Sequence, residues 1–305
     1  MAQHSSKHNV YIAGGPGGDS IGPAIHNYIA GSLGLDWTCE FLRLSDVNDV
    51  MTLFRRDDFA GGIVTMPHKR TIIPLLDSVD DFAQDIGACN VVVRTPSGKL
   101  HGTNTDWLGI RNAVNATEKN ENSGQHTAVV YGAGGASRGA VYALAAGLGC
   151  STIYIINRDD NEVAALMADV EAYRHFSRPR LVHVTSLEQA ETLQCPRYII
   201  CTVPDFEPTS PTEVACRDIL GQFLQRGRQQ QNILLDMCYH PPVTRNIKAA
   251  MEASWTVIPG FLVSGHQFAR QWELWAGRHI DSHTVLTMCN DLVRERESSK
   301  VVAAA

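Results

Sequence analysis

A glycine-rich stretch in the middle of the chain has the composition of a turn that binds phosphate. An apolar run over 129–131 leads into this turn, and an alanine-rich segment over 140–146 follows it. Glycines let the backbone approach a pyrophosphate closely, and free N–H groups at the start of a helix attract its negative charge. The turn would consist of Gly132, Ala133, Gly134, Gly135, Ala136 and Ser137. Because Ser137 stands where the strict G-x-G-x-x-G pattern has a third glycine, a glycine-rich turn without a nucleotide remains the alternative.

Two side chains elsewhere could carry acid–base chemistry. Lys69 follows the apolar segment 61–64 and a turn that contains a proline, so it would stand just past a buried strand. Asp106 stands among short polar residues directly before a helix expected over 108–114. Taken separately, each has a plain structural explanation, because a lysine beyond a strand is usually solvated and an aspartate before a helix usually caps it.

A second glycine-rich turn follows the apolar segment 10–13 and precedes a helix expected over 24–33. It contains two prolines, and no acidic residue ends a clear strand about 20 residues farther on, as a dinucleotide site would require. We therefore interpret it as a loop for a small polar ligand, with Ser20 as a hydroxyl donor, or as a plain surface turn.

Composition indicates a globular chain that is long enough for two domains. The 305 residues are 44% hydrophobic and 19% charged, with a formal net charge of −6. This charge gives no basic footprint for nucleic acid or an anionic membrane, and no apolar run approaches the roughly 20 residues that span a bilayer. The polar N-terminus has no signal-peptide core. Because the eight cysteines are scattered without C-x-x-C pairs, we expect reduced thiols in a cytoplasmic protein and no metal site.

Short apolar segments in the first part of the chain predict a small sheet with its own helices. We expect a strand over 41–44, a helix over 47–54 and a hairpin turn over 96–98. The polar run 115–125 is the best candidate for a domain boundary. The sequence therefore predicts a first α/β domain over 10–114.

In the second half of the chain strands and helices alternate, which is typical of a parallel, doubly wound sheet. A helix is expected over 162–176, a proline-rich loop over 205–212 and a polar helix end over 221–231. The expected strands lie at 151–156, 182–184, 198–202 and 233–237. We predict a Rossmann-type nucleotide-binding domain over 125–258, with helices over 261–305 that return to complete the first domain.

Taken together, these segments resemble the shikimate dehydrogenase family over residues 10–277. The specificity of the resemblance comes from motifs that follow one another in the family's order. They are its substrate loop at 16–23, its Val-Thr-x-Pro-x-Lys at 64–69, its Gly-Ala-x-Asn at 87–90, its Asn-Thr-Asp at 104–106, and its Gly-Ala-Gly-Gly-Ala-Ser-Arg-Gly at 132–139. Within the family, the segment 237–241 looks most like the fungal quinate dehydrogenases.

The resemblance implies reversible hydride transfer between a nicotinamide cofactor, NAD or NADP, and a ring hydroxyl of quinate or shikimate. Lys69 and Asp106 would be the catalytic pair, and either could take the proton of the hydroxyl. The cofactor would bind the glycine-rich turn and the residues Asn157, Arg158 and Asp159. The residues implied for substrate binding are Ser20, Gly22, Thr65, Asn90, Tyr239 and Gln267.

Position 22 departs from the family, which has a second serine in the substrate loop. With Gly22, one hydroxyl is lost and space is gained. Quinate carries an extra hydroxyl on the carbon that bears its carboxylate, so added room would favour quinate over shikimate. Alternatively, Gly22 only relaxes the turn before Pro23.

The ribose-binding turn is ambiguous. Arg158 after Asn157 resembles the family's NADP pattern, in which a guanidinium faces the 2′-phosphate. Asp159 and Asp160 would repel that phosphate and could accept hydrogen bonds from the ribose of NAD. Together with the resemblance to the fungal quinate enzymes, this favours NAD.

Two further functions stay open. A sensor derived from a dehydrogenase could bind the ring acid without turning it over, or an enzyme could act on a related cyclic acid. For the enzyme we expect a monomer or homodimer, a small-molecule cyclic hydroxy acid as its ligand, and neither nucleic acid nor membrane as a partner. The active site would lie in a cleft between the domains, which would close to exclude water.

Overall fold

The computed structural model describes residues 8–16, 20–118, 126–175, 178–228 and 230–303. The chain divides into two compact units, the first formed by Met1–Thr105 with Ser264–Ala305 and the second by Asp106–Val263. Helix α4, Asp106–Thr117, therefore belongs to the second unit, although the sequence analysis ended the first domain at residue 114. Most of the polar run expected as the boundary, 119–125, lies outside the described residues.

The first unit has a six-stranded sheet in the order β2-β1-β3-β5-β6-β4. Strand β1 pairs in parallel with β2 and β3, whereas β5 runs antiparallel to β3 and to β6. The hairpin expected over 96–98 is therefore confirmed. The strands are β1 His8–Gly14, β2 Trp37–Arg43, β3 Phe59–Val64, β4 Ser78–Val79, β5 Val91–Arg94 and β6 Leu100–Thr103. The helices are α1 Gly22–Ser32, α2 Val47–Phe54, α3 Asp81–Ile86, α10 Gly260–Ala276 and α11 Ser282–Ala303, with a short 3₁₀ turn at Ile73–Leu75.

Two adjacent glycines of β3 let helices approach both faces of this sheet. A Cβ at Gly61 would lie 2.5 Å from the Trp275 ring of α10, and one at Gly62 would lie 2.6 Å from the Phe54 ring of α2. Because successive residues of a strand point to opposite faces, α10 and α2 pack on opposite sides of β3. The Trp275 indole also donates a hydrogen bond to the Val92 carbonyl, 3.2 Å, which joins α10 to β5.

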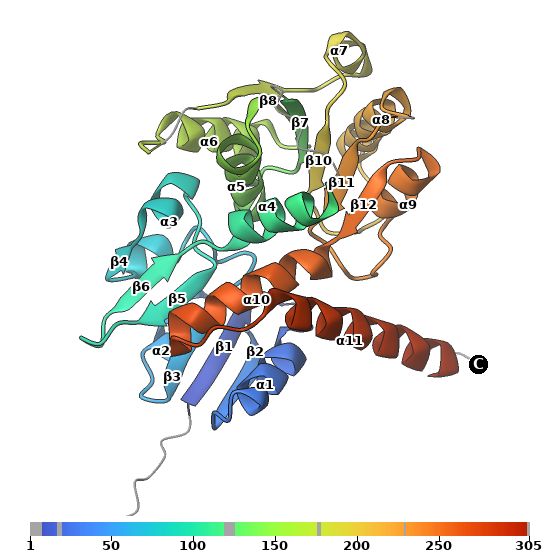
Figure 1. Cartoon of the computed structure of the whole chain (residues 1–305). Helices are drawn as coiled ribbons and strands as arrows, with labels where there is room; N and C mark the ends of the chain where they lie inside the picture. Colours follow the sequence, from blue (N-terminus) through green and yellow to red (C-terminus); the bar gives the residue numbers. More distant parts are fainter. Residues whose placement is uncertain (1–7, 17–19, 119–125, 176–177, 229, 304–305) are drawn as a thin grey trace, which may run out of the picture. The chain divides into compact units, whose positions relative to one another are not determined.

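The second unit has a six-stranded parallel sheet in the order β12-β11-β10-β7-β8-β9 (Figure 1). The predicted doubly wound sheet is confirmed, and its strand order reverses between β7 and β10. The strands are β7 His126–Tyr131, β8 Cys150–Ile156, β9 Arg180–His183, β10 Tyr198–Cys201, β11 Ile233–Asp236 and β12 Thr256–Pro259. The helices after α4 are α5 Gly135–Tyr142, α6 Asp160–Glu171, α7 Leu187–Thr192, α8 Pro211–Arg226 and α9 Arg245–Glu252, and a π-helical segment at Ala143–Gly147 extends α5.

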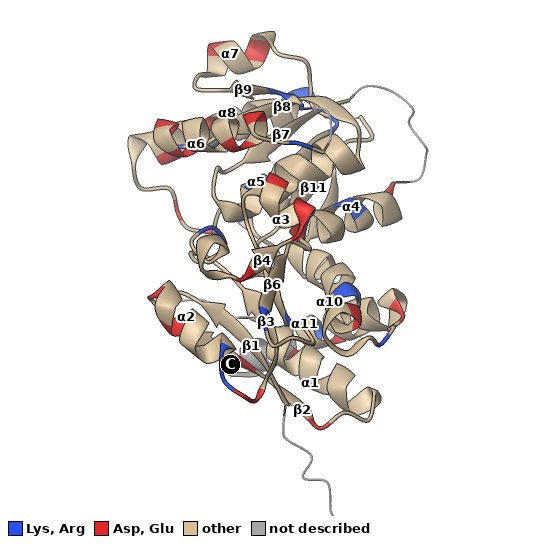
Figure 2. Ribbon diagram, turned by 90° about the vertical axis from the view of Figure 1, so that its left-hand side faces the viewer, with Lys and Arg blue, Asp and Glu red and all other residues tan. Residues whose placement is uncertain are grey.

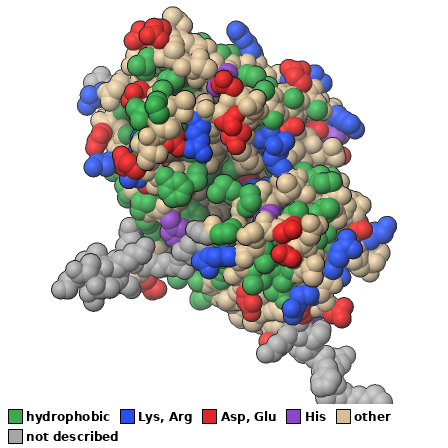
Figure 3. All heavy atoms as spheres, turned by 180° about the vertical axis from the view of Figure 1, so that it is seen from behind, with side chains coloured by type: hydrophobic (Ala, Val, Ile, Leu, Met, Phe, Trp, Pro, Cys, Tyr) green, Lys and Arg blue, Asp and Glu red, His purple; other side chains and the backbone are tan. Residues whose placement is uncertain are grey.

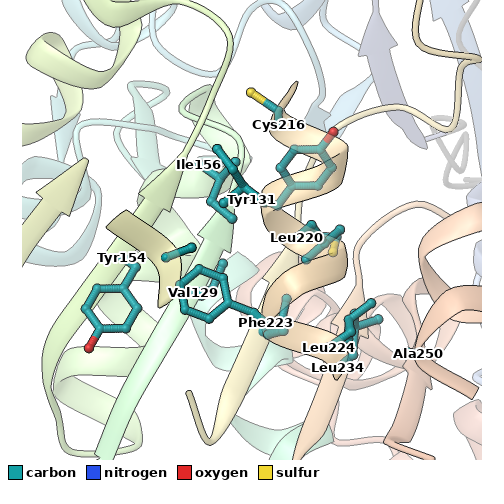
Figure 4. Packing of buried hydrophobic residues seen from close by; sticks show 14 of the residues in the cluster. Val129, Tyr131, Tyr154, Ile156, Cys216, Leu220, Phe223, Leu224, Leu234 and Ala250 are labelled. Carbon is teal, nitrogen blue, oxygen red and sulfur yellow. The ribbon is translucent and has the colours of Figure 1, made fainter. Parts of the chain in front are cut away.

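Helix α8 covers one face of this sheet, and the sequence analysis did not predict it as a whole. Its buried side chains Leu220 and Phe223 pack with Val129 and Tyr131 of β7 (Figure 4). Its start is marked by a capping box with Ser210 as N-cap, and Pro211 follows at the first helical position. The polar helix end expected to reach residue 231 is wrong, because α8 ends at Arg226.

Two general features of the molecule are the distribution of charged side chains on its surface and the length and apolar character of its helices. On the face seen in Figure 3, basic and acidic side chains are interspersed, without a large area of one sign. Among the residues that the structure describes, no helix has both the length and the apolar character of a membrane span.

Candidate functional site

The glycine-rich turn of the second unit ends in the free N-terminus of a helix. Helix α5 begins with Gly134 as its N-cap, which has no side-chain cap. A Cβ at Gly134 would meet no atom within 4 Å, so the backbone here faces open space. The N–H groups of this first turn can therefore bind an anion such as a pyrophosphate, because they lack partners within the helix.

Ser137, where the glycine pattern has its third glycine, links the turn to the neighbouring strand. Its hydroxyl lies 2.7 Å from the Thr202 hydroxyl, just past β10. Gly132 has a φ of 124°, and a Cβ at this position would collide with the same Thr202 oxygen. Gly132 is therefore required by both its backbone conformation and a close approach. The turn has the form of a phosphate-binding loop although Ser137 breaks the pattern.

Arg138 holds the turn from the protein side, a role that the sequence analysis missed. The side chain is 1% exposed, and its Nη1 donates to the carbonyl oxygens of Ala133, 2.7 Å, and Gly134, 3.1 Å. Its Nε donates to an Asp169 carboxylate oxygen on α6 at 2.5 Å. The available signal was an arginine inside the expected first turn of a helix, where a basic side chain opposes the helix dipole.

The turn after β8 holds the three residues implied for ribose binding. The Asp159 carboxylate caps α6 by accepting from the Asn161 and Glu162 N–H groups at 2.9 and 3.4 Å. The Asn157 amide donates to the Asp159 carbonyl at 3.1 Å. Arg158 forms an ion pair with Glu213 at the start of α8. Acidic residues recur along the ribbon of α6 (Figure 2), which follows this turn directly.

Tyr239 follows β11 in a segment that a buried carboxylate holds. Asp236 is 0% exposed and accepts hydrogen bonds from the Cys238 N–H, 3.0 Å, the Thr244 hydroxyl, 2.7 Å, and the Asn246 amide, 3.0 Å. Burial raises the pKa of Asp236 to about 6, and these hydrogen bonds oppose the shift. Because its partners lie on both sides of Tyr239 in the sequence, Asp236 fixes the loop that carries this residue.

In the first unit, the turn that carries Lys69 is fixed by its backbone. The Lys69 carbonyl accepts from the Cys89 N–H at 2.7 Å, and the N–H of Ile72 donates to the His68 carbonyl at 3.0 Å. The buried His68 ring forms a hydrogen bond with the Leu44 carbonyl, 2.7 Å. No role was predicted for His68, since a single histidine on an apolar turn carries no signal of its partner.

Asn90 connects the lysine turn with the stretch before Asp106. Its amide oxygen accepts from the Thr105 N–H at 2.7 Å, and its amide nitrogen donates to the Thr105 hydroxyl at 3.1 Å. The Val64 N–H donates to the Asn90 carbonyl at 2.9 Å. Asp106 follows Thr105 directly as the first residue of α4, where its carboxylate, 2% exposed, suits the positive end of the helix.

Close packing surrounds Gly22 in the substrate loop, of which residues 17–19 lie outside the described residues. The Gly22 N–H donates to the Ser20 hydroxyl at 3.0 Å. A Cβ at position 22 would lie 2.5 Å from Cδ1 of Ile12 and 2.9 Å from the Ser20 oxygen. Ile12 and Ser20 thus occupy the direction in which a side chain at position 22 would point. A glycine here therefore has a packing reason within the protein itself.

The remaining residues implied for the substrate lie on separate elements. Thr65, just past β3, packs against the backbone of Gly14 at the end of β1, so close that a Cβ there would collide with its hydroxyl. Gln267 lies in α10 and is 8% exposed. Hydrogen bonds thus join the lysine turn, Asn90 and Thr105 in the first unit. Tyr239 and the residues implied for cofactor binding belong to the second unit.

Comparison with known proteins gives this arrangement a family. Residues 12–92 match the family described as shikimate dehydrogenase substrate binding domain. The quinate dehydrogenase of Emericella nidulans is 34% identical over 293 residues, which cover 89% of this chain and 88% of that protein.

Solved structures agree with the fold of both units. The shikimate 5-dehydrogenase of Thermus thermophilus, in complex with NADP(H) and shikimate, is 26% identical with a TM-score of 0.72, covering 93% of this chain and 99% of that one. The quinate dehydrogenase of Corynebacterium glutamicum, in complex with NAD, has a TM-score of 0.74 at 21% identity, covering 92% and 98%. The resemblance found in the sequence is thereby confirmed, and the chain belongs to the shikimate dehydrogenase family.

Proposed function

We propose that the protein is an NAD(P)-dependent dehydrogenase of quinate or shikimate. The observation that carries this function is the hydrogen-bonded path from the Lys69 carbonyl through Cys89 and Asn90 to Thr105, the residue before Asp106. It supports a short distance between a lysine turn and an aspartate at a helix start. An amine and a carboxylate near one hydroxyl can hold it and move its proton.

The chain's residues would divide the reaction as follows. Lys69 and Asp106 would bind the ring hydroxyl that reacts, and one of them would take its proton during oxidation and return it during reduction. Ser20 and Tyr239 would bind the carboxylate of the acid, with Thr65, Asn90 and Gln267 at its other hydroxyls. A bound nicotinamide would supply the hydride acceptor, or the donor in the reverse direction.

The donor groups of the second unit fit such a cofactor. Its pyrophosphate would lie against the start of α5, where Gly134 leaves open space and the helix N–H groups face outward. Its adenosine ribose would lie near Asn157 and Asp159 after β8. Because Arg158 is already paired with Glu213 and the turn is rich in carboxylates, we expect NAD rather than NADP.

The choice of acid has less support from the residues. The Emericella nidulans relative is a quinate dehydrogenase, and the Thermus thermophilus structure was solved with shikimate. We therefore expect turnover of both acids, with quinate preferred. We also place the protein in the cytoplasm, because all eight cysteines are free thiols, which suits a reducing compartment.

Steady-state rates with both acids and both cofactors test the proposal. We expect reduction of NAD with quinate at alkaline pH, and a loss of at least ~100-fold for Lys69→Ala and for Asp106→Ala, because each removes a group that handles the proton. The exposed Lys99 and Asp49 offer matched controls, and Lys99→Ala and Asp49→Ala should keep the wild-type rate. No turnover of either acid with either cofactor would overturn the proposal, and binding of acid without turnover would favour the sensor.

A further inference from the structure

Glu213, at the start of α8, carries a carboxylate that is held on both oxygens. Its Oε2 accepts from the Thr209 and Ser210 N–H groups at 2.9 and 3.0 Å, and the Ser210 hydroxyl accepts from the Glu213 N–H at 3.2 Å. Its Oε1 binds the guanidinium of Arg158. One carboxylate thus completes a capping box and also reaches the turn after β8.

The charge of this carboxylate is constant across the neutral range. The N–H groups of Ser210 and Thr209 lower the pKa of Glu213 to about 2, with a smaller contribution from Arg158. The side chain is 24% exposed, whereas the Arg158 side chain is 62% exposed. An exposed pair of this kind adds little to stability, so its main effect is on the orientation of Arg158 and on the net charge of the turn.

The other charges around the turn after β8 are mostly negative. Asp159 caps α6, and Asp160 lies 3.8 Å from the His183 ring. Glu162 accepts from the Asn157 amide at 3.0 Å. Arg158 is the one permanent cation in the sequence 157–160, and Glu213 neutralises it.

A ribose 2′-phosphate would meet two costs at this turn. It brings about two negative charges, which the carboxylates repel, and it must take the guanidinium away from Glu213. A free 2′-hydroxyl has neither cost and can donate to a carboxylate. We infer that Glu213 is the specificity-determining residue that restricts this enzyme to cofactors with an unphosphorylated ribose, by holding Arg158 away from the 2′ position. This inference rests on the proposed dehydrogenase function.

The variant Glu213→Gln isolates this effect. Glutamine retains the capping box and removes the charge, so α8 is expected to form as in the wild type. Calorimetry with 2′,5′-ADP and 5′-AMP measures binding of the two adenosine ends without turnover. We expect the preference for 5′-AMP to fall by roughly tenfold or more, since a freed guanidinium can form charge-assisted hydrogen bonds with the 2′-phosphate. The ratio of kcat/KM for NADP over NAD should rise by a similar factor.

Two controls separate this mechanism from a general charge effect. Glu207, in the loop that precedes α8, pairs with Arg245 at 2.7 Å. Glu207→Gln should leave the ratio of the affinities for 5′-AMP and 2′,5′-ADP unchanged. The double variant Glu213→Gln with Arg158→Gln should lose the increase in relative affinity for 2′,5′-ADP, because this increase requires the guanidinium. If Glu213→Gln leaves the ratio of the affinities for 5′-AMP and 2′,5′-ADP unchanged while the wild type turns over its substrate, the inference about Glu213 is overturned and the proposed function still stands. Absence of turnover in the wild type would instead count against the proposed function.

Discussion

The guanidinium of Arg138 is buried beneath the glycine-rich turn and holds it by two carbonyl oxygens. A lysine would keep the charge but could not form this fork of hydrogen bonds together with the Asp169 contact. We therefore expect Arg138→Lys to weaken NAD binding by roughly tenfold, with binding of quinate unchanged. Calorimetry with each ligand alone measures both effects. Arg180→Lys, at an exposed arginine of β9, is the control, and equal losses for cofactor and acid would contradict this role.

Single residues differed in how far the sequence could predict them. Lys69 and Asp106 could be proposed as the catalytic pair because each stands in a linear motif, and their roles stay predictions. His68 and Arg138 were not given roles, since their partners, the Leu44 carbonyl and Asp169, are distant in the sequence. The packing around Gly22 could not be predicted for a related reason. The neighbour that fills its space is Ile12, on a strand before the loop.

At the scale of elements, a buried histidine joins α10 to α1. His26 is 0% exposed, and its Nδ1 accepts from the Trp272 indole at 3.0 Å. Burial lowers the pKa of His26 from 6.5 to about 3. The unfolded chain therefore binds a proton that the folded protein does not, so this contribution to stability is present above pH 6.5 and is lost as the pH falls toward 3.

His26→Gln removes the titrating group while leaving an acceptor for the indole. We expect the wild type to lose about 2 kcal/mol more unfolding free energy than this variant between pH 7 and pH 5. Urea denaturation at both pH values measures the difference. The exposed His279→Gln is the control and should follow the wild type. Parallel pH dependence in wild type and His26→Gln would show that the histidine does not control acid stability.

Among the elements, the central strands of the second sheet, β7, β8, β10 and β11, were the most predictable, because each contains a continuous apolar run. Helix α8 was not, because the prolines before it indicated a loop, although Cys216, Ile219, Leu220, Phe223 and Leu224 recur at helical spacing. Ser210, Pro211 and Glu213 in fact formed a complete start signal. The contact of Glu213 with Arg158 joins the start of α8 to the turn after β8, which meet only in the folded chain, so no local pattern could reveal it.

At the scale of the whole molecule, the order of strands and helices was enough to predict an α/β chain with a Rossmann-type sheet. The boundary between the two units was harder to predict from the sequence. The sequence placed it in a polar run, whereas the units divide between Thr105 and Asp106, where the chain is buried and carries no change of composition. The division falls between Thr105, bound to Asn90, and the proposed catalytic carboxylate.

Two units with separate cores should respond separately to the two ligands. A ligand that binds only the native state at 100 times its Kd stabilises it by about 2.7 kcal/mol, and amide hydrogen exchange reports where local opening is suppressed. NAD alone should slow exchange in the second unit, at 132–137 and 157–160. Quinate alone should slow it most in the first unit, around 64–69. In Lys69→Ala the protection by NAD should persist while that by quinate is reduced, and protection by quinate confined to the second unit would contradict the proposed position of the acid.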